Sequence, residues 1–210
     1  DGSKVEIFDS RAVLDDAHTV RLSDGTTKTA KHILIATGGH PVRPDMPNAH
    51  LGMVSDDIFH MADLPKTILI VGGGYIACEF ACILNGLGVE VTQVYRGAQI
   101  LRGFDEEARG LISDMMREQG VNLHVGTNIV EMGPASADHT ASVAGTATVA
   151  AMGAPAGEGV EERSDVAGGP VRVKQTNGTE AVYDAVLFAT GRAPNTAGMG
   201  LERVGVEIGR

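Results

Sequence analysis

The sequence predicts an α/β fold that combines a parallel sheet with an antiparallel β-meander. Thr67–Val71 is an aliphatic run that leads, through three glycines and a segment of helical periodicity, to a second apolar run at Glu90–Tyr95. A strand, a helix and a strand within about 30 residues form the βαβ unit of a buried parallel sheet. Ile129–Met132 and Val171–Gln175 have the composition of paired antiparallel strands.

Composition and charge exclude several classes of protein. The 210 residues are 43% hydrophobic, which is typical of a globular chain. The net charge of −10 argues against nucleic acid as a partner, and no apolar run is long enough for a membrane span. Two cysteines cannot form a disulfide framework, so we expect a cytoplasmic location, with an organelle as the open alternative. The chain begins with aspartate, which suggests a processed chain or a piece of a longer one.

The N-terminal segment is expected to be rich in β-structure. Asp24-Gly25 is a hairpin signal, and His32–Ala36 is an apolar run that predicts a buried strand ending at Thr37-Gly38. Four prolines make His40–Pro65 a connector, with one helical turn near Asp56–Met61. The other short strands expected in this segment are Val5–Phe8, Thr19–Leu22 and Thr27–Lys31.

The central segment supplies the helices that a parallel sheet requires. Ile76–Leu87 carries apolar residues at helical spacing, and Gly88 follows as the residue that ends the helix. Asp105 is expected to cap a second helix that runs to Gln119, and Val121–Val125 is expected to be a third strand. The resulting βαβαβ order is half of a Rossmann-like, doubly wound fold.

Residues 133–169 interrupt the predicted meander. They hold ten Ala and seven Gly in 37 positions, which indicates a low-complexity surface insertion. Val182–Ala189 is then expected to be a last buried strand, which ends at Thr190-Gly191.

The glycine-rich turn carries the chemistry. Gly72-x-Gly74-x-x-Ala77 follows a strand and opens a helix, which is the context of a dinucleotide-binding fingerprint. Gly72 would allow the tight turn, Gly74 would let the backbone approach a pyrophosphate, and Ala77 would let the helix pack closely on the strands. The free N–H groups of the helix start would bind the phosphates.

The next strand favours NADPH over NADH. An NAD site has an acidic residue at the end of this strand, whereas Glu90–Tyr95 ends in tyrosine and Arg96 follows. Arg102 lies six residues farther on. Guanidinium groups match the oxygens of a 2′-phosphate, so Arg96 and Arg102 are the candidate ligands; the alternative is that they are ordinary surface charges.

These features together resemble the FAD-dependent pyridine nucleotide–disulfide oxidoreductases, and in particular the NADPH-binding portion of the glutathione reductases. The resemblance covers nearly all of the chain except 133–169. Lipoamide dehydrogenases carry the acid that is absent here, and trypanothione reductases usually have a longer link between helix and second strand. The matching segments are Val71–Ala77 (VGGGYIA), Asn85–Gly88 (NGLG), Tyr95–Gly97 (YRG), Arg102–Asp105 (RGFD), Ile33–Pro41 (ILIATGGHP) and Val186–Thr196 (VLFATGRAPNT).

The resemblance implies a domain organisation and roles for individual residues. Residues 1–38 would be part of an FAD-binding domain, residues 39–191 an NADPH-binding domain with the insertion at 133–169, and residues 192–210 the return into the FAD-binding domain. Tyr75 would be a gate over the flavin that nicotinamide displaces, and Glu79 would lie near the flavin. The implied NADPH-binding residues are Gly72, Gly73, Gly74, Tyr75, Ile76, Ala77, Glu79, Arg96, Arg102 and Gly191, and those near FAD are Thr37, Gly38 and Arg192.

The resemblance further implies that the intact enzyme is a homodimer that reduces glutathione disulfide with NADPH and FAD. Its redox cysteines and catalytic histidine have no counterpart here, so we expect this chain to bind NADPH but not to reduce disulfides. Cys78 and Cys82 lie four apart on a helix, which suits a disulfide poorly and indicates core residues. No cluster of His and Cys has metal-ligand spacing. Trypanothione reductase, another NADPH-dependent disulfide reductase and a non-catalytic NADPH-binding remnant remain as alternatives.

Overall fold

A computed structural model describes residues 2, 4–135 and 169–209, which form two compact units. The larger unit is Pro41–Arg192, and the smaller one is Asp1–His40 with Ala193–Arg210. The chain passes between the units at β4 (Gly39–Pro41) and β13 (Arg192–Pro194), which pair with each other in a two-stranded sheet. The predicted insertion at 133–169 lies outside the described residues except at its ends, where residues 133 and 134 extend strand β9.

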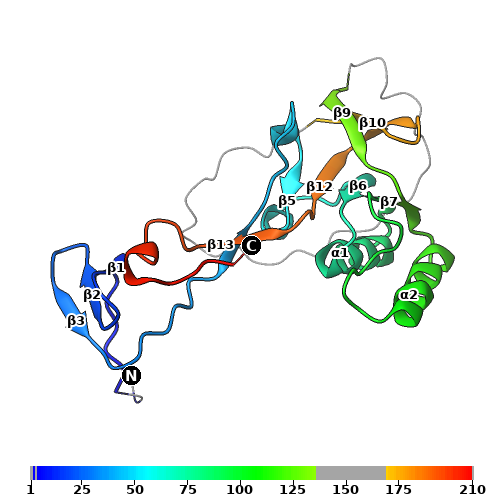
Figure 1. Cartoon of the computed structure of the whole chain (residues 1–210). Coiled ribbons are helices and arrows are strands. Elements are labelled where there is room, and N and C mark those ends of the chain that lie inside the picture. Colours follow the sequence, from blue (N-terminus) through cyan, green and yellow to red (C-terminus); the bar gives the residue numbers. More distant parts are fainter. Residues whose placement is uncertain (1, 3, 136–168, 210) are drawn as a thin grey trace. The chain divides into compact units, whose positions relative to one another are not determined.

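A five-stranded parallel sheet is the centre of the larger unit (Figure 1). The chain forms β6, β7 and β8 in turn on one side, and β12 then returns to the other side of β6. The order of the strands therefore reverses between β6 and β12. In spatial order the strands are β5 (Met53–Val54), β12 (Ala185–Phe188), β6 (Thr67–Val71), β7 (Glu90–Tyr95) and β8 (Asn122–Val125).

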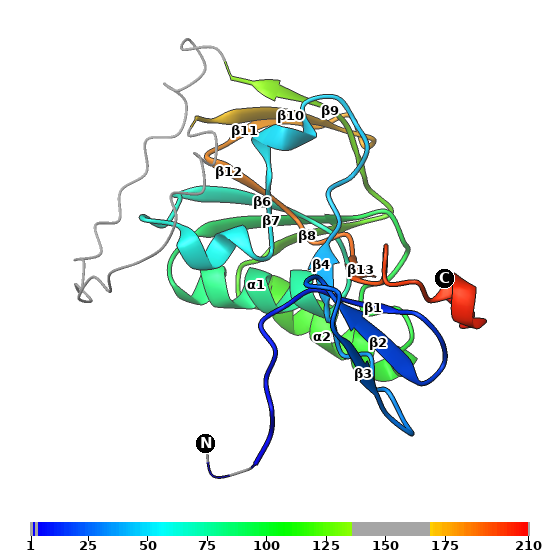
Figure 2. The ribbon, with the colours of Figure 1, turned by 90° about the vertical axis from the view of Figure 1, so that its left-hand side faces the viewer.

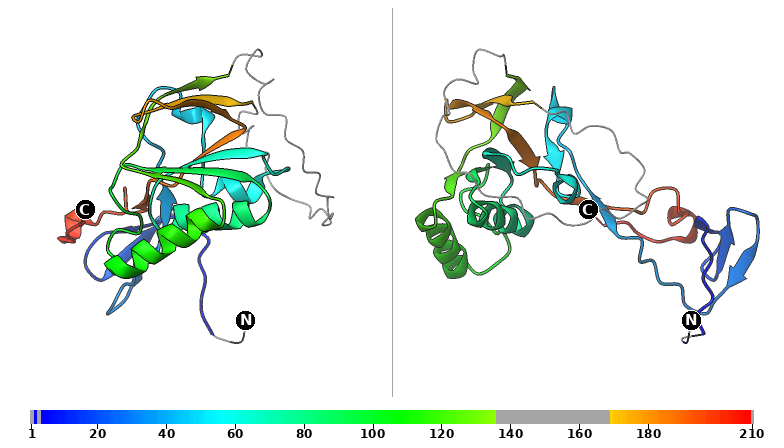
Figure 3. Two further views of the ribbon diagram at one scale, coloured as in Figure 1. Left: turned by 90° about the vertical axis from the view of Figure 1, so that its right-hand side faces the viewer. Right: turned by 180° about the vertical axis from the view of Figure 1, so that it is seen from behind.

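The sheet is the middle of three layers, which confirms the predicted fold class (Figure 2). The antiparallel meander covers one face, and the helices α1 (Tyr75–Gly86) and α2 (Glu106–Glu118) cover the other, as the left view of Figure 3 also shows. The meander consists of β9 (Ile129–Pro134), β10 (Val171–Gln175) and β11 (Glu180–Tyr183).

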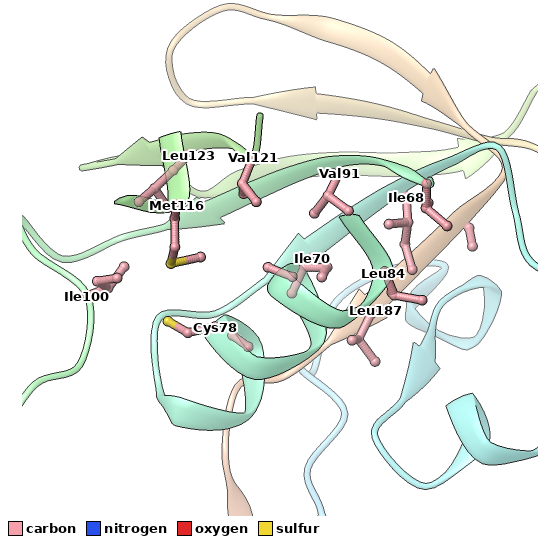
Figure 4. Close-up of a cluster of buried hydrophobic side chains, with 14 of the residues drawn as sticks. Ile68, Ile70, Cys78, Leu84, Val91, Ile100, Met116, Val121, Leu123 and Leu187 are labelled. Carbon is pink, nitrogen blue, oxygen red and sulfur yellow. The ribbon is translucent and has the colours of Figure 1, made fainter. Parts of the chain in front are cut away.

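Alternation along β6 builds both halves of the core. Ile68 and Ile70 pack with residues of α1 and α2, whereas Leu69 and Val71 pack against the meander. All four are at most 5% exposed. Successive side chains of a strand point to opposite faces, so an uninterrupted aliphatic run is the pattern of a strand buried on both sides. Figure 4 shows the cluster on the helical side.

The two helices begin and end where the sequence predicts. Asp105 Oδ1 accepts hydrogen bonds from the N–H groups of Glu107 and Ala108, both at 3.0 Å, and so caps α2. Gly88 and Gly120 follow the two helices with φ of +88° and +103°, the left-handed conformation that favours glycine.

The buried face of α1 is narrower than its apolar pattern predicts. Its small residues Ala77 and Ala81 are completely buried, which brings the helix close to the sheet. Ile83 and Leu87 remain 53% exposed, and Cys82 is exposed, so the expectation that both cysteines lie in the core is wrong for Cys82. The helix therefore meets the sheet mainly through Ala77, Ala81 and Leu84, and the apolar residues Ile83 and Leu87 are only partly covered.

Asp184 divides the strand predicted at Val182–Ala189 into two. Its Oδ2 accepts hydrogen bonds from the N–H groups of Lys66 and Thr67 at 3.0 Å, and its own N–H donates to Thr67 Oγ1 at 3.0 Å. The side chain thereby ties the start of β12 to the start of β6. Val182 and Tyr183 belong instead to the meander, as part of β11.

The smaller unit holds an antiparallel sheet of β1 (Ala12–Leu14), β2 (Thr19–Leu22) and β3 (Thr27–Thr29). Gly25 has φ of +87° in the turn between β2 and β3, so the predicted hairpin is confirmed. The strands predicted at Val5–Phe8 and His32–Ala36 do not form, and Leu34 is 89% exposed. A strand needs a hydrogen-bonded neighbour, and the described residues provide none for these two segments.

The described residues also contain three short 3₁₀ helices. They are η1 (Ala49–Leu51), η2 (Asp57–His60) and η4 (Glu202–Val204). The second confirms the helical turn expected near Asp56–Met61, whereas the two-residue strand β5 inside the same connector was not predicted.

Candidate functional site

A cavity of about 1050 Å³ lies at the carboxyl ends of the parallel strands. Its walls include the end of β6 and the turn that follows (Val71–Ile76), the end of β7 (Val94–Gly97) and the end of β12 (Phe188–Arg192). These segments meet beside the point where the strand order reverses, which is where open α/β sheets bind ligands. Arg102, Ser55 and the segments Pro44–Met46 and Asn128–Val130 complete most of the lining.

The glycine turn after β6 accepts no side chain at its first position. Gly72 has φ of +145°, and a β-carbon there would lie 2.3 Å from the carbonyl oxygen of Ala189. Its N–H donates to Val94 O at 2.9 Å, so the turn is held between β7 and the end of β12. A β-carbon on Gly74, by contrast, would have no atom within 4 Å. Gly74 is also the N-cap of α1. Because glycine has no side chain to accept hydrogen bonds from the free N–H groups at the start of the helix, these groups remain available to a ligand.

Tyr95 forms the floor beneath the middle of this turn. A β-carbon on Gly73 would lie 2.3 Å from Cγ of Tyr95, and one on Gly97 would lie 2.5 Å from Cε1 of the same ring. The ring therefore fills the space next to both glycines. Tyr95 also lines the cavity, and it stands where an NAD site would carry a carboxylate.

A buried amide supports the turn from below. Gln93 on β7 is completely buried, and its Nε2 donates to Gly72 O at 2.9 Å. Among the described residues, its Oε1 has no hydrogen-bond partner. The amide thus fixes the direction of the Gly72 carbonyl in a region that water does not reach.

The charged lining of the cavity is mostly basic. Arg96 and Arg102 line it and are exposed, and no ion pair within the described part of the chain engages either guanidinium. Arg192 lines it as well and forms an ion pair with Asp56 at 3.0 Å. Asp45 is the one carboxylate among the lining residues. Two exposed guanidinium groups beside a glycine turn form a site suited to a phosphorylated ligand.

The cavity brings together most of the residues that the sequence predicts for nucleotide binding. Gly72, Gly73, Gly74, Tyr75, Ile76, Arg96, Arg102, Gly191 and Arg192 all line it. Ala77 lies beneath the turn and is completely buried. Glu79 is exposed on α1, one helical turn beyond Tyr75, and is not part of the lining. Thr37 and Gly38 belong to the smaller unit, where Thr37 Oγ1 donates to Asn195 O at 2.8 Å.

Some lining residues were not predicted. Tyr95 was predicted only to stand in place of an acid, although an aromatic residue at the end of a strand, two positions before a glycine, was a usable signal. Asn128–Val130 and Pro44–Met46 come from a strand start and from a proline-rich connector. Neither segment carries a motif, so only the three-dimensional arrangement reveals them.

The two cysteines lie outside the cavity lining. Cys78 is buried, Cys82 is exposed, and neither is in a disulfide. Burial raises the pKa of both thiols above the ordinary value, so neither is an activated thiolate at neutral pH.

Neither a metal centre nor a membrane-spanning helix is present among the described residues. They contain no group of three or more His, Cys, Asp or Glu side chains placed to hold a metal ion. In the same residues, every helix is too short or too polar to cross a bilayer.

Residues 1–154 match the sequence profile of the pyridine nucleotide-disulphide oxidoreductase family, and the chain belongs to this family. The fold is also similar to that of two solved structures. The flavoprotein disulfide reductase RclA of Escherichia coli superimposes with a TM-score of 0.72 at 22% identity, over 99% of this chain and 41% of that one. LpdA of Mycobacterium tuberculosis gives 0.66 at 24% identity, over 98% of this chain and 40% of that one.

Within the family, the chain is similar to glutathione reductases, as the sequence motifs predict. It is 39% identical to the glutathione reductase of Burkholderia cepacia over 99% of this chain and 39% of the relative. It is 37% identical to that of Nostoc over 97% and 38%, and 36% identical to the chloroplastic and mitochondrial enzyme of Pisum sativum over 98% and 32%. The chain thus spans less than two fifths of the length of each of these relatives.

Proposed function

We propose that this chain is the central, NADPH-binding portion of a glutathione reductase-like flavoenzyme. The observation that carries the proposal is the pair of exposed arginines, Arg96 and Arg102, which line the cavity beside the glycine turn. β7 ends in Tyr95, so no carboxylate stands there to repel a 2′-phosphate. The glutathione reductase relatives support the same assignment.

The residues that line the cavity fit a phosphorylated dinucleotide such as NADPH. The backbone at Gly72–Gly74 forms a cradle without side chains, and a β-carbon at Gly72 would collide with the neighbouring strand. The start of α1 would bind the pyrophosphate through its N–H groups, and Arg96 and Arg102 would hold the 2′-phosphate. Tyr75, which lines the cavity and is 56% exposed, would be the gate over the flavin that the nicotinamide displaces. Glu79 lies one helical turn farther along α1 and would, like Tyr75, lie near the flavin.

The wider reaction is part of the proposal, and the names of the glutathione reductase relatives support it. In the intact enzyme, FAD would supply the redox chemistry that connects NADPH, through a pair of cysteines, to glutathione disulfide, and the residues of this chain would bind and orient the NADPH. We propose that the smaller unit contributes to an FAD-binding domain, with Thr37 and Gly38 near the cofactor, and that the larger unit is the NADPH-binding domain, whose cavity Arg192 helps to line. We expect the 210-residue chain alone to bind NADPH without reducing glutathione disulfide, because its two cysteines, Cys78 and Cys82, lie four apart on a helix, which suits a redox disulfide poorly, and both are free. The homodimer and the substrate also belong to the proposal.

A comparison of the two nucleotides tests the proposal. We would measure the Kd of NADPH and of NADH by titration calorimetry for the 210-residue chain and for Arg96→Gln and Arg102→Gln. Each substitution removes a charge-assisted contact to the 2′-phosphate, so each should raise the NADPH Kd about tenfold and change the NADH Kd less than about twofold. Arg117→Gln is the matched control, because it removes an exposed charge from α2 that does not line the cavity. An equal loss for both nucleotides would contradict the assignment.

A further inference from the structure

The loop that presents Arg102 is shaped by residues behind the cavity wall. Ile100 is completely buried and Leu101 is 8% exposed, whereas the next residue, Arg102, is exposed and lines the cavity. The chain must therefore turn sharply from core to cavity within three residues.

Leu101 makes this turn in an unfavourable conformation. Its φ is +56°, a left-handed value that a leucine rarely adopts. Such a conformation persists only where the surroundings fix it. One fixing contact is the hydrogen bond from the Leu101 N–H to Gly73 O, at 2.6 Å, which fastens the loop to the glycine turn.

Arg109 makes the second fixing contact, from α2. Its Nε donates to Ile100 O at 2.7 Å, and its Nη2 donates to Gln99 O at 3.0 Å. The planar guanidinium thus bridges the carbonyls of two successive loop residues, and both bonds are partly buried. Arg109 itself does not line the cavity, so it has no direct access to a ligand there.

We propose that Arg109 is a positioning residue that sets the preference of this site for NADPH over NADH. Arg109 donates hydrogen bonds to the Gln99 and Ile100 carbonyls, and these bonds keep Leu101 in its left-handed conformation. That conformation in turn presents Arg102 to the 2′-phosphate. The inference rests on the proposed NADPH-binding function and adds a determinant to it. Without the guanidinium, two partly buried carbonyls lose their donors and the loop can relax away from the strained turn.

The test uses the 210-residue chain with Arg109→Gln, Arg109→Lys and the control Arg117→Gln, each checked for folding by circular dichroism. Arg109→Gln should lower the ratio of NADPH to NADH affinity about fivefold or more, mainly through a higher NADPH Kd. Arg109→Lys keeps the charge but offers a single ammonium in place of the fork, so its ratio should fall between those of wild type and Arg109→Gln. Arg117→Gln should leave the ratio unchanged.

A double substitution separates positioning from a direct effect of charge. If Arg109 acts through Arg102, adding Arg109→Gln to Arg102→Gln should change the NADPH Kd little further, because the two residues form one pathway. Additive losses would overturn the inference. So would an unchanged ratio or an equal weakening of both nucleotides in Arg109→Gln, or a fully wild-type ratio in Arg109→Lys beside a loss in Arg109→Gln.

The same titrations separate this inference from the proposed function. If Arg96→Gln and Arg102→Gln leave the preference for NADPH intact, the proposed nucleotide site is wrong and the role of Arg109 fails with it. If those variants lose the preference and Arg109→Gln keeps it, only the positioning role is overturned.

Discussion

The ring of Tyr95 lies so close to Gly73 that no side chain fits at position 73. A β-carbon on Gly73 would be 2.3 Å from Cγ and 2.5 Å from Cδ1 of the ring, closer than real contacts come. The middle glycine of the turn is therefore required by the residue at the end of β7, and not by its own backbone conformation, since its φ is outside the positive range. The two positions form a matched pair.

Gly73→Ala should therefore impair both folding and NADPH binding, because either the turn or the ring must move. Overpacking of this kind costs about 1–3 kcal/mol. Tyr95→Val removes the ring, so the double variant Gly73→Ala/Tyr95→Val should recover much of the stability that Gly73→Ala alone loses. Urea unfolding of the four proteins in this cycle measures the coupling. Additive free energies in the cycle would show that the two residues do not compete for space.

Gly74→Ala should separate binding from stability. A β-carbon there would meet nothing within 4 Å, and the φ of Gly74 is −81°, which alanine adopts readily. We expect the free energy of unfolding to fall by no more than about 1 kcal/mol, because alanine is a poorer N-cap than glycine but lowers the entropy of the unfolded chain. NADPH binding should weaken, because the added methyl group occupies the path by which the pyrophosphate approaches the backbone. Unchanged NADPH affinity would argue against the phosphate cradle.

Removal of the α2 cap should have a modest and local cost. Asp105→Ala removes the acceptor for the N–H groups of Glu107 and Ala108 and should lower the free energy of unfolding by about 1 kcal/mol. Asp114→Ala is the control, since Asp114 lies on the same helix and makes only an exposed ion pair with Arg117. Its effect should stay within a few tenths of a kcal/mol. Equal effects of the two variants in urea unfolding would contradict the capping role.

Stability should fall on the alkaline side of neutrality. Burial raises the pKa of the Cys78 thiol and of the Tyr183 phenol above their ordinary values. The folded state therefore favours the neutral forms, and this contribution is fully present below the pKa of the unfolded chain. It is lost as the pH rises through the higher pKa of the folded state, so the decline should begin near the ordinary thiol pKa of about 8.5.

Urea midpoints measured between about pH 7 and pH 10 check this dependence. Cys78→Ala should show a smaller decline than wild type just above about pH 8.5, whereas Cys82→Ala should resemble wild type more closely, since Cys82 is exposed. A stability that rises or stays level through this range would contradict the assignment.

The sequence predicted the elements whose signals are local. Thr67–Val71 has five consecutive aliphatic or β-branched residues and forms β6 with the predicted bounds. Asp105 caps the start of α2 with its side chain, and Gly120 follows the end of the helix with a left-handed backbone conformation. The glycine turn was likewise predicted from its motif, and the two arginines from their place after the second strand; the structure brings both into the lining of one cavity, and their role in NADPH binding stays a prediction.

Elements that depend on residues distant in the sequence could not be predicted from local patterns. His32–Ala36 has the composition of a strand, yet strands require a partner and the described residues give it none. The break at Asp184 depends on the N–H groups of Lys66 and Thr67, far away in the sequence. The role of Tyr95 depends in the same way on Gly73 and Gly97 across the turn.

Asp184 has a mechanical consequence for the larger unit. It is the single residue between β11, in the meander, and β12, in the parallel sheet. With no slack at this junction, β11 cannot detach from the meander without pulling on β12, whose far end lies against the glycine turn. The two sheets should therefore lose protection against amide hydrogen exchange together, and loosening of the meander should also loosen the end of β12 that lines the cavity.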